Sequence, residues 1–133
     1  MKKLPKTEMQ RRRRTLMRMM EKNSIAIIPS APEKTRNRDV TYPYRQDSDF
    51  LYLTDFSEPE SVAVFIPGRK QGEYILFCRE RDEEKETWHG RRAGQTGAIE
   101  QFHADDAFPI SDIDEILPGL MENRERVYYT MGK

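Results

Sequence analysis

Hydrophobic and polar residues follow one another along this chain in patterns that predict both helices and short strands. Near the start, apolar residues recur at spacings of seven, eight and eleven, which suit one stripe of a helix; they are Met9, Leu16, Met17 and Met20. Thr7 and Gln10 stand three residues apart, as in a capping box with the hydroxyl at the N-cap position. We therefore predict a helix from about Glu8 to Glu21.

Runs of apolar and β-branched residues predict the strands. Three such runs have the composition of buried strands; they are Ser24–Ile28, Val62–Ile66 and Tyr74–Cys78. The last two are separated by Pro67-Gly68 and a polar segment, which predicts a hairpin. Phe50–Thr54, in which Phe50 and Tyr52 have period-two spacing, is predicted as a further strand, and Arg126–Thr130 as one more.

Two helices are predicted in the second half of the chain. One is short, over Ala98–Phe102, and the other begins near Ser111. The second has an apolar face; its members are Ile113, Ile116, Leu117, Leu120 and Met121. Pro118 and Gly119 interrupt it, so it should be short or kinked. The order of elements predicts an α/β domain, a mixed β-sheet layered with helices.

Length and composition predict one domain with a modest core. Of 133 residues, 36% are apolar and 35% charged, so contacts with another domain or subunit would help to complete the core. The chain ends three residues after the last predicted strand, and we expect the sequence to continue beyond Lys133. Residues 1–133 are thus interpreted as one domain of a longer protein.

The balance of charges indicates which classes of partner the domain can bind. Lys+Arg and Asp+Glu both number 23, which argues against a whole-domain nucleic-acid surface and leaves little repulsion against self-association. Arg11 to Arg14 spread around more than one helical turn and do not form a single docking face, so we interpret them as part of a solvated helix. RNA binding through this helix stays an alternative. The charged run from Arg79 to Glu86 is also expected to be solvated.

The polar residues do not form a complete catalytic or metal-binding motif. His89 and His103 lie outside any known metal-ligand spacing, and we predict no metal site. Two acidic pairs, Asp105 with Asp106 and Asp112 with Asp114, are interpreted as helix-start charges.

The compartment is predicted from the cysteine and the apolar runs. Cys78 is the single cysteine and falls in a predicted strand, so its thiol is expected to be inert in a reducing compartment. No signal-peptide pattern follows the basic start, and no apolar run reaches membrane-spanning length. A cytoplasmic protein is expected.

Two polar and aromatic segments remain as candidate working surfaces. Asp39–Phe56 contains five aromatic residues, and Thr87–Arg92 contains Trp88, the single tryptophan. Trp88 lies between a charged run and a Gly-Arg-Arg turn, so we expect it near the surface. Exposed Trp and Arg are typical of interface anchors. Arg91 and Arg92 have the geometry to pair with carboxylates of a partner or a substrate.

These segments also resemble a known family. Tyr42–Thr54, followed by Glu58-Pro59-Glu60, is similar to the N-terminal domain of aminopeptidase P, the Xaa-Pro aminopeptidase. Thr87–Arg92 resembles the Trp-x-Gly-Arg-Arg loop of the same family. The two motifs occur in the expected order, and the resemblance spans nearly the whole chain.

The resemblance implies a fold shared with the N-terminal domains of creatinase and prolidase. In that family a catalytic "pita-bread" domain follows and carries two manganese ions, and the enzyme removes the first residue of a peptide when proline is second. The ligand motifs of that domain are absent from these residues. The resemblance therefore implies an accessory domain of a metallo-aminopeptidase, without catalytic or metal-binding residues of its own.

The resemblance also implies roles for single residues. Trp88 and Asp39 would lie at the rim of the substrate cleft, with Arg91 and Arg92 supporting the Trp88 loop. A second motif, of interface or structural importance, contains three residues; they are Tyr44, Arg45 and Asp49. The implied partners are the catalytic domain of the same chain, a second subunit in a homo-oligomer, and a peptide with proline second. A stand-alone binding or scaffold domain is the alternative.

Overall fold

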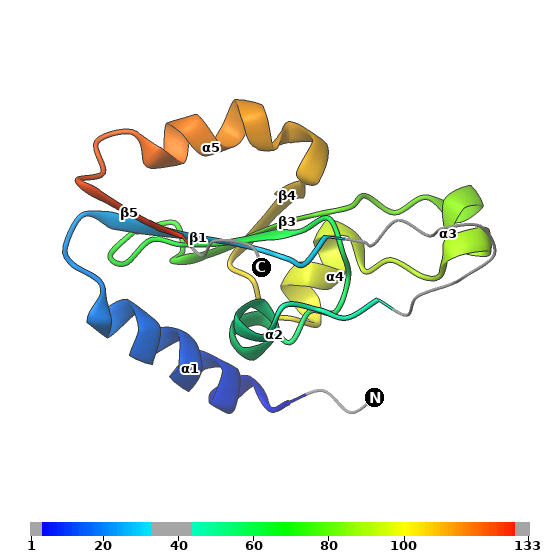
Figure 1. The fold of residues 1–133 in the computed structure, drawn as a ribbon, viewed down its shortest axis with the longest axis horizontal. Coiled ribbons are helices and arrows are strands. Elements are labelled where there is room, and N and C mark those ends of the chain that lie inside the picture. Colours follow the sequence, from blue (N-terminus) through cyan, green and yellow to red (C-terminus); the bar gives the residue numbers. More distant parts are fainter. Residues whose placement is uncertain (1–3, 33–43, 130–133) are drawn as a thin grey trace.

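The computed structural model describes residues 4–32 and 44–129, which form a five-stranded mixed sheet covered by helices on both faces (Figure 1). The strand order is β4-β3-β2-β1-β5. In chain order the strands are β1 Ser24–Pro29, β2 Val62–Phe65, β3 Tyr74–Cys78, β4 Asp106–Pro109 and β5 Arg126–Tyr129. The central pairs β1–β2 and β2–β3 are antiparallel, whereas the outer strands β4 and β5 run parallel to their neighbours. The predicted α/β class is confirmed.

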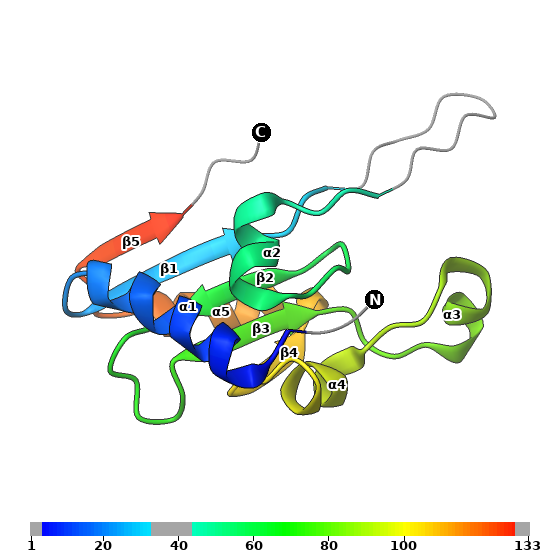
Figure 2. The ribbon, with the colours of Figure 1, turned by 90° about the horizontal axis from the view of Figure 1, so that it is seen from below.

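The helices form two layers. Helices α1 (Lys6–Met19), α2 (Ser48–Thr54) and α4 (Gly94–Glu100) cover one face, and α5 (Ile113–Met121) crosses the other, after a 3₁₀ turn at Ile110–Asp112 (Figure 1). Helix α3 (Glu83–His89) is different, because it stands beyond the end of the sheet, at the tip of two extended arms (Figure 2). In the described ranges, no helix is both long and apolar enough to cross a membrane.

The period-two pattern of the central strands divides the core between the two faces. Under α1, α2 and α4 lie the buried side chains of alternate positions; in the strands these are Ala26, Ile28, Ala63, Phe65, Tyr74, Leu76 and Cys78. The intervening positions pack under α5; the fully buried ones are Ile25, Val64, Ile66, Ile75 and Phe77. The strands predicted over these residues are therefore confirmed, as is the apolar face predicted for α5.

The strand predicted over Phe50–Thr54 is wrong, because these residues form α2. Phe50, Leu53 and Thr54 are buried, which is the i, i+3, i+4 spacing of a helix face. The side chain of Asp47 accepts a hydrogen bond from the Phe50 N–H at 2.9 Å and begins the helix. Asp55, with a positive φ of 57°, ends it.

Other predicted boundaries also need correction. The capping box at Thr7 is wrong, since α1 begins at Lys6 after Pro5, without a side-chain cap. The short helix predicted at Ala98–Phe102 is α4 and begins earlier, at Gly94. The sequence pattern missed β4, because this edge strand contains an aspartate and a proline in four residues.

The acidic pairs have different surroundings. Asp112 and Asp114 lie at the start of α5, as predicted. Asp105 and Asp106 do not begin a helix. The Asp105 carboxylate accepts hydrogen bonds from the backbone N–H groups of Glu73 and Tyr74, and Asp106 is the first residue of β4.

The Arg11–Arg14 run is not uniformly solvated, contrary to our expectation. Arg13 is buried, and its guanidinium donates to the carbonyl oxygens of Leu53 at 2.8 Å and Phe102 at 3.3 Å. Arg12 pairs with Glu8 and donates to the carbonyl oxygen of Tyr52. These two arginines therefore tie α1 to the rest of the domain.

Candidate functional site

The candidate site is the segment of residues 79–93 that leaves the sheet after β3 and returns before α4. We call it the Trp88 excursion. Figures 1 and 2 both show its helix, α3, away from the sheet. Trp88 lies in the last turn of α3 and is 80% exposed. The segment was predicted as a solvated charged run followed by a loop. Residues 83–85 are exposed, as expected, whereas the loop prediction is wrong for residues 87–89, which belong to α3.

A single carboxylate joins the two arms of the excursion. The Glu86 side chain accepts from the Asp82 N–H at 2.7 Å on the first arm and from the Arg92 N–H at 3.0 Å on the second. The Nε of Arg81 contacts both carboxylate oxygens at 3.0 Å. The Arg92 N–H, then Arg81 and the Asp82 N–H, lower the pKa of Glu86 to about 2. The Glu86 side chain is only 8% exposed, so its expected solvation is wrong.

The two arginines of the predicted motif have different positions. Arg91 is exposed. Arg92 is half-buried, and its guanidinium Nη1 donates to the carbonyl oxygen of Glu80 at 3.1 Å. This contact crosses from one arm of the excursion to the other, so the structure places Arg92 within the scaffold of the segment and Arg91 on its surface.

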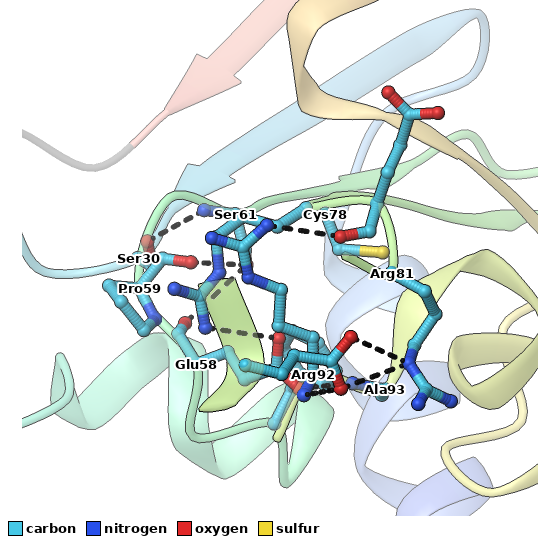
Figure 3. Close-up of polar contacts among 12 residues, drawn as sticks. Ser30, Glu58, Pro59, Ser61, Cys78, Arg81, Arg92 and Ala93 are labelled. Carbon is cyan, nitrogen blue, oxygen red and sulfur yellow. Dashed lines mark hydrogen bonds and ion pairs between the residues drawn. The ribbon is translucent and has the colours of Figure 1, made fainter. Parts of the chain in front are cut away.

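A second carboxylate, Glu58, connects the two ends of the excursion, Arg79 and Ala93, which we call its base. It pairs with Arg79 at 3.4 Å and accepts from the Ala93 N–H at 2.8 Å, so that one acid contacts both arms. Figure 3 shows Glu58 with Arg81, Arg92 and Ala93 gathered in this region. Arg79 is largely buried with Glu58, which corrects its predicted solvation. Gln95 completes the base by donating to the carbonyl oxygen of Cys78 at 3.0 Å.

Gln46 connects the other predicted motif to this base. Its side-chain amide donates to the carbonyl oxygen of Glu58 at 2.9 Å and accepts from the Ala31 N–H at 2.8 Å. The Tyr44 hydroxyl donates to the carbonyl oxygen of Ala31 at 2.6 Å. Through Glu58, the segment that contains Tyr44 and Gln46 thus contacts both arms of the Trp88 excursion.

The remaining predicted site residues are Arg45, Asp49 and Asp39. Arg45 and Asp49 are exposed near the start of α2. Asp39 lies outside the described residues. The structure therefore brings together Trp88, Arg91 and Arg92 on one excursion, and it places Tyr44 in the network that supports the base.

Three residues important to this site were missed in the sequence; they are Gln46, Glu58 and Glu86. Gln46 and Glu58 stood inside or next to the quoted motif, so their position was a signal. Glu86 was hidden in a charged run, where composition alone indicated solvation. Its place four residues after Asp82 is the available signal, because a carboxylate in the first turn of a helix can accept from backbone N–H groups there.

The described residues hold neither a cluster of metal ligands nor a reactive thiol. Among residues 4–32 and 44–129, no group of three or more His, Cys, Asp and Glu side chains could hold a metal ion. The thiol of Cys78 is buried in β3, and this burial raises its pKa to about 11. A thiol that stays protonated at neutral pH is a poor nucleophile. The fold and the site thus define an α/β domain that presents an aromatic side chain on a supported excursion.

The family is shown by comparison with known proteins. The sequence pattern of the family described as "Aminopeptidase P, N-terminal domain" matches residues 9–128. This chain belongs to that family, and the resemblance inferred from the two motifs is confirmed.

Relatives agree in sequence and in fold. The Xaa-Pro aminopeptidase of Escherichia coli (strain K12) is 42% identical over 134 residues, which cover 100% of this chain and 30% of the relative. The solved structure of Pseudomonas aeruginosa aminopeptidase PepP is 66% identical with a TM-score of 0.93, over 99% of this chain and 30% of that one. Zn-substituted E. coli aminopeptidase P in complex with product has a TM-score of 0.90 and 42% identity, with the same coverage of both chains. The chain thus spans about 30% of the length of these relatives.

Proposed function

We propose that residues 1–133 are the N-terminal domain of an Xaa-Pro aminopeptidase, which removes the first residue of a peptide when proline is second. The family membership and the E. coli relative named Xaa-Pro aminopeptidase support this proposal. The catalytic domain would lie in the remaining part of a longer protein, since this chain spans only 30% of that relative. The domain would act by shaping the substrate cleft and by supporting oligomerisation.

Trp88 is the residue that we propose for the rim of the cleft. The observation that carries this role is its 80% exposure at the end of a helix whose arms are tied by Glu86 and Glu58. A large aromatic side chain in water gains from contact with an apolar partner, and a proline ring supplies such a surface. Asp39 is proposed for the same rim from the motif alone.

The proposal extends to a neighbouring subunit. Because α3 stands beyond the sheet, Trp88 is well placed to reach a cleft outside its own domain (Figure 2). Arg91, exposed beside it, can pair with a carboxylate of a partner or of a peptide terminus. The formal net charge of zero leaves little repulsion between two copies of the domain.

The metal chemistry would belong to the rest of the protein. The described residues do not fit a metal site, whereas the E. coli relative is named as Zn-substituted. We propose that two manganese ions are held by the catalytic domain. The residues of this chain would bind and orient the peptide and limit the entry of water. We also propose a cytoplasmic location, because the single cysteine suits a reducing compartment.

The test is to replace Trp88 by alanine in the longer protein. We expect kcat/KM for an Xaa-Pro peptide to fall about thirty-fold, which corresponds to ~2 kcal/mol, as for an aromatic anchor at an interface. Metal content should not change, because Trp88 is not a ligand. Lys85→Ala, on the same helix and exposed, is the matched control and should retain activity. Equal kinetics of Trp88→Ala and the wild-type protein would rule out the cleft role.

A further inference from the structure

The position of Trp88 must be set by groups other than its own side chain. Its indole is 80% exposed, so packing cannot fix it. Helix α3 has seven residues, and helices of this length are unstable in water without further contacts. Figures 1 and 2 show α3 away from the sheet and its layers of helices. The excursion therefore depends on polar contacts to hold α3 in place.

Those contacts converge on Glu86, two residues before Trp88. One carboxylate oxygen, Oε2, accepts from the Asp82 N–H at the start of α3, and the other, Oε1, accepts from the Arg92 N–H after its end. The backbone carbonyl of Glu86 also accepts from the Gly90 N–H at 3.1 Å. One residue thus fixes the helix at its start, at its end and on the returning arm.

We propose that Glu86 is the positioning residue of Trp88, which keeps the indole at a fixed place by tying both arms of the excursion to α3. This inference rests on the proposed cleft role of Trp88 for its effect on activity. We call the two hydrogen bonds from the Asp82 and Arg92 N–H groups to the Glu86 carboxylate the tie. The tie does not depend on the cleft role, because it concerns only the conformation of residues 79–93.

A carboxylate is specifically required. Two backbone N–H groups approach two different oxygens of Glu86, so both oxygens must be acceptors. A glutamine has the same size but only one acceptor oxygen, and its amide nitrogen would face one of these donors. Glu86→Gln must therefore release one arm, and the contact with Arg81 is no longer an ion pair.

The first experiment measures the tie in the longer protein. Hydrogen exchange is compared in Glu86→Gln and in the matched control Glu84→Gln, which changes an exposed acid on the same helix. We expect amides of residues 82–92 to exchange at least about tenfold faster in Glu86→Gln, because local opening becomes easier. Amides of β2 and β3 should be unaffected in both variants. Unchanged exchange in residues 82–92 would overturn the proposal.

The second experiment links the tie to Trp88 through a double-mutant cycle on kcat/KM for an Xaa-Pro peptide. Glu86→Gln should lower kcat/KM about tenfold in the wild-type background and have no further effect when Trp88 is already alanine. An equal loss in both backgrounds would show that Glu86 acts by another route and would overturn the positioning role. If Trp88→Ala alone has no effect, the cleft role fails, while the exchange experiment still decides the tie.

A second variant covers the case in which Glu86→Gln does not fold. Arg81→Met removes the side-chain partner of Glu86 and leaves both backbone contacts in place. It should increase exchange in residues 82–92 by a smaller factor, about threefold, because a half-exposed ion pair contributes little. If Arg81→Met increased exchange in β2 and β3 to the same extent, the effect would be global and the tie would not be local.

Discussion

At the residue scale, Arg13 differs most from its prediction, because it is buried although its run of arginines was expected to be solvated. It occupies the apolar stripe of α1, four residues after Met9 and four before Met17. Its guanidinium lies 4.2 Å from the ring centroid of Tyr74, whose other neighbour is the stacked ring of Phe65. Burial lowers the pKa of Arg13 from its ordinary value. A charge at this depth is tolerated because carbonyl oxygens and an aromatic face surround it.

Replacing Arg13 by alanine should destabilise the domain. Two carbonyl oxygens, of Leu53 and Phe102, lose their donor, and the cation–π contact with Tyr74 is lost. The cost should be about 2–4 kcal/mol, which urea unfolding followed by circular dichroism would measure. Arg14→Ala, next in sequence but exposed, is the control and should change stability by less than ~0.5 kcal/mol. Equal midpoints for the two variants would contradict this account.

At the element scale, short helices were harder to predict than strands. The buried strands were found because a strand that is covered on both faces is a short continuous run of apolar and β-branched residues, which the local sequence reveals. Helix α2 has only seven residues. Two of its aromatic residues, Phe50 and Tyr52, have the period-two spacing that is expected of a strand. Asp47 as N-cap and Asp55 in the left-handed conformation decided the outcome. Helix α3, in a charged run, had no apolar pattern to reveal it.

Gly94 lies where the Trp88 excursion ends and α4 begins, and it has a left-handed backbone conformation. Its φ is +72°, and an added Cβ would lie 2.6 Å from Cγ of Arg81. Gly94→Ala should therefore cost about 1–2 kcal/mol for the left-handed backbone, and it should also displace the Arg81 side chain from Glu86. Thermal unfolding monitored by circular dichroism would measure the loss.

Gly119 in α5 is the matched control for this substitution. An added Cβ there has no atom within 4 Å. Gly119→Ala should be neutral or stabilise the domain by up to ~1 kcal/mol, because alanine favours helix. A stabilising effect of Gly94→Ala would contradict the strain that we assign to its backbone.

At the scale of the whole molecule, a sheet covered on both faces explains how a chain with few apolar residues forms a core. Helices α1, α2 and α4 close one face and α5 closes the other (Figure 1). The excursion lies outside both layers and is held by acids. The stability of the core and that of the excursion should therefore respond differently to acid.

Acid should loosen the domain in a defined window. Hydrogen bonds from Arg11 and Arg12 lower the pKa of Glu8 to about 2, and contacts from Arg92, Arg81 and Asp82 lower that of Glu86 to about 2. Because the folded pKa values lie below the ordinary value of 4.5, their contribution is complete above that pH and is lost as the pH falls to about 2. Urea midpoints between pH 7 and 2 would measure this loss.

The variant Glu86→Gln serves as the comparison for the acid experiment. It lacks one of the two titrating groups, so its urea midpoint should fall less steeply than that of the wild-type protein below pH 4.5. Arg81, the charged partner of Glu86, is half-exposed and is therefore partly screened by ions, so the difference should shrink in high salt. Parallel curves for the two proteins would show that Glu86 does not titrate as described.

The sequence by itself determined the strands of the central sheet, the apolar stripe of α1, the face of α5 and the family. These follow from local periodicity and from two motifs, which are readable without knowledge of the fold. Only the tertiary structure decided that Arg13 is buried, that Glu58 joins Arg79 and Ala93, and that Glu86 ties the excursion. The physical reason is that the local sequence does not tell a buried, paired charge from a solvated one, because the partner is brought near only by the fold. The Ala93 N–H that donates to Glu58, for example, lies 35 residues away along the chain.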